Sequence, residues 1–171
     1  DGIVRGSGLL VALNAHGIDN ERILMPKSGQ YLSFQKSKYN KQIYPNSLMG
    51  SMALLRQMYH DAAWYSKGSS TTRDLSLEAL EKNKGLTQIF YAGDKGNDLR
   101  AHELGASFGI NYVVFGGGNE YELIDEIKST KATYILPLNF PKAYDVEDPF
   151  EAERLSLADM KDWNLAPTNP G

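Results

Sequence analysis

The stretch YVVFGGGNEYE, residues 112–122, places three consecutive glycines between an apolar run and a polar segment. Residues 112–115 are apolar and β-prone, which predicts a buried strand. Asn119 and Glu122 have the spacing of an N-x-x-E capping box, which predicts a helix after the glycines. In α/β proteins, loops at the carboxyl ends of strands are where ligands bind. Four loop residues are therefore candidates for a strand-end pocket: Gly116, Gly117, Gly118 and Asn119.

Strands and helices alternate on both sides of this loop. Residues 86–92 and 132–136 predict strands, and residues 98–108 predict a helix that ends at Gly109. Such alternation indicates parallel pairing with right-handed crossovers. The predicted fold class is therefore α/β, built from parallel βαβ units whose strands end in polar loops.

The first 45 residues have a different pattern. Short apolar runs between turn formers predict an irregular, strand-rich region, with strands at 8–13, 22–25 and 30–34. A helix capped by Asn46 or Ser47 and ending near Tyr65 opens the parallel α/β portion, residues 46–171, and a short helix follows at 74–82. We expect both regions to belong to a single domain excised from a larger chain.

Acidic residues cluster near the end of the chain. The motif DPFE, residues 148–151, combines a cap, a proline at the first helical position and a glutamate that completes a capping box. A helix start accounts for much of the cluster, and a divalent-metal site is the alternative. The members of the cluster are Asp145, Glu147, Asp148, Glu151 and Glu153.

Composition narrows the class of function. With 42% hydrophobic and 23% charged residues, the 171-residue chain has the composition of a soluble globular protein. A net charge of -3 argues against nucleic acid as a partner, and no apolar run reaches the roughly 18 residues of a membrane span. The chain has no cysteine and only three widely spaced histidines, His16, His60 and His102. A metal hydrolase built from these residues alone would be short of ligands.

The glycine loop can be compared with known phosphate-binding loops. It lacks the GK[ST] ending of a P-loop, and Tyr121 stands where the last glycine of GxGxxG belongs. Glu120 and Glu122 also add negative charge to the segment that would hold an anion. An anion- or nucleotide-binding module that uses Gly116–Gly118 is therefore kept only as an alternative.

A second polar loop follows the strand predicted at 86–92. Asp94 and Lys95 lie at the ligand-binding edge of the predicted sheet, where they are placed to orient a substrate. The simpler interpretation is that Asn97 or Asp98 caps the next helix.

Four segments follow one another in a recognisable order: YPNSLMGSMALLRQMYHDAAWY (44–65), IFYAGDKGNDLRAHELGASFG (89–109), YVVFGGGNEYELIDEIK (112–128) and ATYILPLNF (132–140). Together they resemble the imidazolonepropionase-like amidohydrolases, and DPFEAE (148–153) is similar to an acidic stretch of that family. The resemblance covers roughly residues 44–153 and implies the central part of a (β/α)8 barrel.

The resemblance also implies a metal site at the strand ends. Active relatives hold zinc or another divalent metal with an HxH pair on the first strand, histidines on middle strands and an aspartate on the last. The metal lowers the pKa of bound water, and hydroxide then attacks a cyclic amide or peptide-like carbonyl. In this chain the middle-strand histidine positions fall on Ala92, or on Tyr91 if the register slips, and on Gly116.

The chain is therefore predicted to be an amidohydrolase-related domain that has lost its metal ligands. It would serve as a structural or ligand-binding part of a larger hydrolase, with the HxH strand before Asp1 and the last strand after Gly171. The expected partner is the rest of the parent chain, or a second copy joined through open sheet edges. The alternative is an active hydrolase with ligands drawn from His16, His102, Asp94 or the acids at 145–148.

Overall fold

A five-stranded sheet in the order β1-β4-β5-β6-β7 organises the chain. The computed structural model describes residues 2–13, 22–39, 41–68, 71–142, 145 and 147–168. The sheet strands are β1 (Val4–Ser7), β4 (Gly29–Ser33), β5 (Thr87–Tyr91), β6 (Tyr112–Phe115) and β7 (Thr133–Ile135). β1 is antiparallel to β4, and the other neighbours are parallel. The chain is therefore a mixed α/β structure with a mostly parallel sheet, and β1 and β7 are the edges of that sheet.

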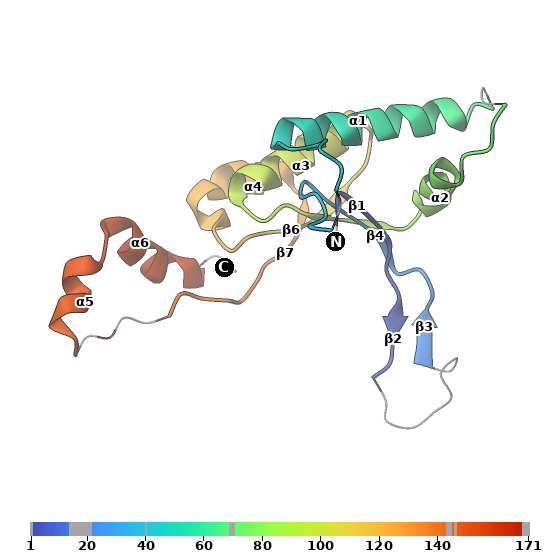
Figure 1. Cartoon of the computed structure of the whole chain (residues 1–171). Helices are drawn as coiled ribbons and strands as arrows, with labels where there is room; N and C mark the ends of the chain where they lie inside the picture. Colours follow the sequence, from blue (N-terminus) through green and yellow to red (C-terminus); the bar gives the residue numbers. More distant parts are fainter. Residues whose placement is uncertain are drawn as a thin grey trace.

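Helices follow the parallel strands, as the sequence predicts. They are α1 (Leu48–Tyr65), α2 (Leu75–Asn83), α3 (Lys95–Ser107), the 3-10 turn η2 (Glu120–Leu123), α4 (Ile124–Thr130), α5 (Pro149–Arg154), α6 (Leu157–Leu165) and η3 (Ala166–Thr168). In Figure 1, α1, α3 and α4 lie together on one side of the sheet, whereas α5 and α6 lie apart from it beyond an extended segment. No helix within the described residues is long and apolar enough to cross a bilayer.

The core lies between the sheet and α1 and α3. Leu32, Phe90 and Val114 are cross-strand neighbours on one face, and all three are fully buried against side chains such as Leu55 and Leu104. Because alternate residues of a strand point to opposite faces, the next row of side chains lies on the other face. That face, which we call the open face, carries Tyr31, Ile89, Tyr91, Val113, Phe115, Thr133 and Ile135.

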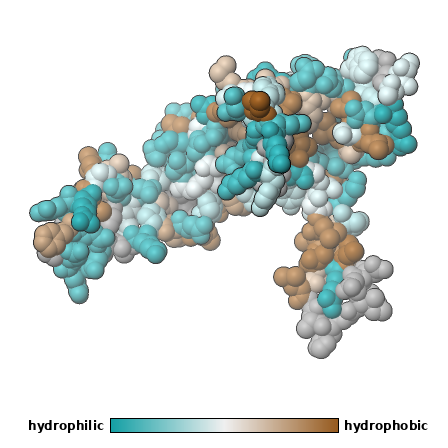
Figure 2. Space-filling view, viewed as in Figure 1, coloured by the Kyte–Doolittle hydropathy of each residue, from teal (hydrophilic) through white to brown (hydrophobic). Residues whose placement is uncertain are grey.

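The first 45 residues contribute directly to the sheet. β1 and β4 come from this region, and β4 pairs in parallel with β5, so the sheet runs across the boundary expected at residue 45. The strand predicted at 8–13 is shorter in the structure, where only β2 (Leu10–Val11) falls within that range, and β1 lies before it. β2 pairs with β3 (Ile23–Met25) in a hairpin that projects from the sheet, and Figure 2 shows apolar side chains gathered on it.

Candidate functional site

The loops after β5, β6 and β7 begin side by side. Tyr91, Phe115 and Ile135 are cross-strand neighbours at the ends of these strands. The ladder continues one residue further, since the Ala92 N–H donates to the Phe115 carbonyl at 3.2 Å and the Gly116 N–H donates to the Ile135 carbonyl at 3.1 Å. The structure thus brings the predicted strand-end residues to a common edge of the sheet.

Asp94 begins α3, and the sequence prediction of Asn97 or Asp98 as the cap was wrong. The Asp94 Oδ1 atom accepts hydrogen bonds from the N–H groups of Gly96 and Asn97, both at 2.9 Å. The Asn97 side chain in turn donates to Asp94 Oδ2 at 2.5 Å. Asp94 therefore stabilises the first turn of the helix, and its carboxylate is engaged within the chain.

The predicted capping box of Asn119 and Glu122 is also wrong. The Asn119 side chain does not cap η2; its Oδ1 atom accepts the N–H of Lys95, the first residue of α3, at 3.1 Å. Glu122 forms an ion pair with the Lys95 ammonium group. Both Asn119 and Glu122 thus bind Lys95 at the start of α3, and the 3-10 turn η2 follows the glycines in place of the predicted α-helix. The box predicted at 148–151 forms in part, since Asp148 caps α5 but Glu151 accepts the Asp145 N–H instead.

At each of the three positions a different physical constraint favours glycine over a residue with a side chain. A Cβ atom on Gly117 would lie 2.3 Å from the Gly93 carbonyl oxygen, so this position permits the close approach of the two loops. Gly118 has a φ of +98°, a conformation that L side chains rarely adopt. At Gly116 a Cβ atom would lie 2.1 Å from Oε1 of Glu120, so the missing side chain leaves room for that carboxylate.

Glu120 folds back into the glycine loop. Its Oε1 atom accepts N–H groups from Gly117 at 2.5 Å and Gly118 at 3.1 Å, and its Oε2 atom accepts from Gly118 at 3.0 Å. The residue is 1% exposed. The amides that a phosphate would need are thus engaged by a carboxylate of the same chain, which argues against the anion-binding alternative.

Asp98 is a second buried acid beside Glu120, and the sequence interpretation missed its role. It is 0% exposed, and within the described part of the chain neither of its carboxyl oxygens has a hydrogen-bond partner. Burial raises the pKa of Asp98 to about 8, and the negative charges of the nearby Glu120 and Asp94 carboxyl groups add to the rise. The helical periodicity of the sequence indicates that Asp98 is buried, because it shares a helix face with the buried residues Ala101 and Leu104.

The positions expected for metal ligands lie on two different faces. Ala92 belongs to the core cluster, and Gly116 borders Glu120. Tyr91 lies on the open face, where its ring stacks on Phe115 with centroids 4.3 Å apart, and the Arg5 guanidinium lies 4.6 Å from the Tyr91 ring centre. These side chains do not fit a divalent metal site. Over the described ranges, no group of three or more His, Asp or Glu side chains is placed to hold one.

The remaining candidate ligands that the structure describes do not converge on this edge. His102 lies on α3 and lines a cavity together with Asn111, which precedes β6, and Thr133, which begins β7. This cavity is therefore at the opposite ends of the strands from the loops. The described acids of the 145–148 stretch are exposed in the segment that carries α5. His16 lies outside the described residues.

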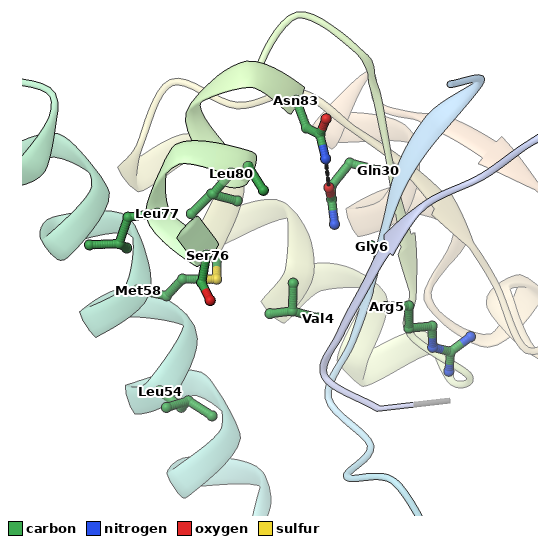
Figure 3. A pocket seen from close by; sticks show the side chains of 11 residues that line it. Val4, Arg5, Gly6, Gln30, Leu54, Met58, Ser76, Leu77, Leu80 and Asn83 are labelled. Atoms are coloured by element: carbon green, nitrogen blue, oxygen red, sulfur yellow. Dashed lines mark hydrogen bonds between the residues drawn. The ribbon is translucent and has the colours of Figure 1, made fainter. Parts of the chain in front are cut away.

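A cavity of about 570 Å³ lies between β1, α1 and α2 (Figure 3). Its walls are mainly apolar, and the hydrogen bond from Asn83 Nδ2 to Gln30 Oε1, 2.8 Å, closes one end. Arg5 points away from it. Gln30 and Asn83 are near the amino-terminal ends of β4 and β5, so the cavity is remote from the strand-end loops. In barrels of parallel strands that amino-terminal side is associated with stability rather than catalysis.

This combination of mostly parallel strands, helices on one face and strand-end loops defines a mixed α/β protein. No protein-family model and no curated protein matches the chain. Among solved structures, an amidohydrolase from Thermotoga maritima MSB8 is similar, with a TM-score of 0.66 and 19% sequence identity. The match covers 95% of this chain and 45% of the Thermotoga chain.

The likeness supports an amidohydrolase-like fold. At 19% identity it concerns the fold alone, so the narrower imidazolonepropionase-like assignment stays a prediction. The chain spans less than half the length of this neighbour.

Proposed function

We propose that the chain is part of the barrel wall of an amidohydrolase-related domain, that this segment is catalytically degenerate, and that it acts as a structural or ligand-binding part of a larger hydrolase. The fold likeness and its coverage of 45% of the Thermotoga chain support the first part of this proposal. In such a barrel the open face would be the interior, and the edges at β1 and β7 would pair with strands of the remaining chain.

One observation carries the proposal of degeneracy. In a barrel, side chains that bind a metal must point inward from the carboxyl ends of the strands. At the ends of β5 and β6 the inward positions are Tyr91 and Phe115, which stack on each other, with Arg5 over the Tyr91 ring. An aromatic pair with a cation offers a flat, apolar surface for packing or for a ligand, and it offers no strong metal ligand.

Metal content and hydrolysis test the proposal together. The purified chain is incubated with zinc, dialysed and analysed by mass spectrometry, and then assayed against a panel of cyclic amides and dipeptides. We expect less than stoichiometric zinc and no turnover above buffer; stoichiometric zinc with turnover would contradict degeneracy. A Tyr91→His, Phe115→His double variant is the positive control for metal binding, because these residues are cross-strand partners on one face.

A further inference from the structure

The cavity between β1, α1 and α2 has apolar walls and one polar end. The apolar side chains come from the two helices and the edge strand: Val4, Leu54, Met58, Leu77 and Leu80 (Figure 3). Val4 is 46% and Leu54 37% exposed, so the cavity opens to solvent between β1 and α1. Its volume of about 570 Å³ falls within the range of small-molecule sites, roughly 300–1,000 Å³. A small ligand can therefore enter and be largely enclosed.

At the polar end, three side chains form a chain of hydrogen bonds with one direction. The Lys27 ammonium group can only donate, and it donates to Asn83 Oδ1 at 3.1 Å. The Nδ2 group of Asn83 therefore faces Gln30, and it donates to Gln30 Oε1 at 2.8 Å. This leaves the Gln30 Nε2 group as the last donor of the chain. Among the described residues its partner is the Tyr31 carbonyl, at a long 3.5 Å.

The Gln30 donor is buried and only weakly satisfied. Gln30 is 2% exposed and lines the cavity together with Asn83. An amide nitrogen carries two N–H donors, and a buried donor without a good acceptor costs free energy. The positive charge of Lys27 polarises the chain in the direction that strengthens a bond from Gln30 to an oxygen atom. Among the described residues that line the cavity none is acidic, so no lining carboxylate opposes an anion there.

We propose that this cavity binds a small monocarboxylate with an apolar body, such as a medium-chain alkanoate, whose carboxylate accepts a hydrogen bond from Gln30 Nε2. The apolar body lies between α1 and α2, where side chains such as Met58 and Leu80 remove it from water. The site is independent of the proposed function, because it lies near the amino-terminal ends of β4 and β5 and uses no residue of the strand-end loops.

Titration of the whole chain with octanoate at pH 7, followed by NMR, tests the site. We expect saturable shifts of the side-chain amide signals of Gln30 and Asn83, because these groups lie at the end that holds the carboxylate. Octylammonium has the same apolar body with a cationic head, and it should bind at least about tenfold more weakly because it cannot accept the Gln30 hydrogen bond. Butyrate should also bind more weakly than octanoate, because it buries fewer CH₂ groups.

Two kinds of variant locate the ligand. Gln30→Glu keeps an acceptor for Asn83 but replaces the Nε2 donor with an oxygen, so it should weaken octanoate binding by more than about tenfold. Ala79→Trp fills the cavity from an exposed position of α2 and should abolish binding. Ala63→Trp makes the same change at an exposed position of α1 outside the cavity lining; it is the matched control and should leave binding unchanged.

Three results would overturn the proposal. The first is the lack of saturable octanoate binding to the native chain. The second is equal affinity for octanoate and octylammonium, which would show an apolar surface that does not recognise the head group. The third is octanoate binding that survives in Ala79→Trp, which would place the ligand elsewhere. If Gln30→Glu fails to fold, the two head groups and the two tryptophan variants still decide the outcome.

Discussion

The two faces of the sheet carry similar side chains in different surroundings. On the covered face, Leu32, Phe90 and Val114 are fully buried beneath α1 and α3. On the open face, the aromatic and aliphatic residues are only partly buried, and Ile135 is 40% exposed. Parallel sheets normally have both faces covered, and their strands are apolar on both sides for that reason. This difference is what we expect if the open face is covered by the rest of a barrel, as proposed above.

The largest expected difference in stability is between two variants that each replace one aromatic residue with alanine, one on each face of the sheet. Phe90→Ala should lower the free energy of unfolding by about 3–5 kcal/mol, because it leaves a cavity in the closed core. Phe115→Ala should cost only about 0.5–1.5 kcal/mol, mainly through the lost stacking on Tyr91. Urea denaturation of both variants measures the difference. Equal losses would mean that the open face is as well packed as the core.

The second prediction concerns the acid on the covered side. Asp98 has a pKa of about 8 in the folded chain, against about 4 when unfolded, so the folded state binds more protons between these values. Stability should therefore fall as pH rises from about 4 to about 8, by up to roughly 1.4 kcal/mol per pH unit.

Denaturation midpoints measured across this pH range check the sign of the slope. Asp98→Asn should remove this contribution to the slope, and Asp125→Asn, an exposed acid, should retain it. A native stability that rises through this range, or a slope unchanged in Asp98→Asn, would mean that Asp98 is ionised in the folded state.

The covered side was also the more predictable one, for physical reasons. The apolar run at 112–115 and the helix from Ser47 to Tyr65 follow from local patterns, and the structure has both at those residues. The start of α3 was less predictable because Asp94, Asn97 and Asp98 can all cap a helix, and only tertiary position distinguishes them.

The reason why residues 116–118 are glycines could not be predicted from the sequence. Nothing local indicates that Glu120 folds back over Gly116, or that the Gly93 carbonyl lies against Gly117. Both facts depend on the register of β5 and β6, which brings their loops together. The missing side chain at Gly116 was interpreted as a vacated ligand position, whereas in the fold that space holds a carboxylate of the same chain.

The smallest expected effect on stability concerns the open face itself. If its apolar surface lacks a second layer in this chain, copies should associate through it and through the edge at β7. Ile135→Lys places a charge on both features and should shift the chain towards monomer in sedimentation velocity, with a stability change within about 0.5 kcal/mol. Ser129→Lys adds the same charge to an exposed position on α4 and should leave association unchanged. A native chain that stays monomeric at all concentrations would contradict the need for a covering layer, because exposed apolar strands at an open edge favour pairing.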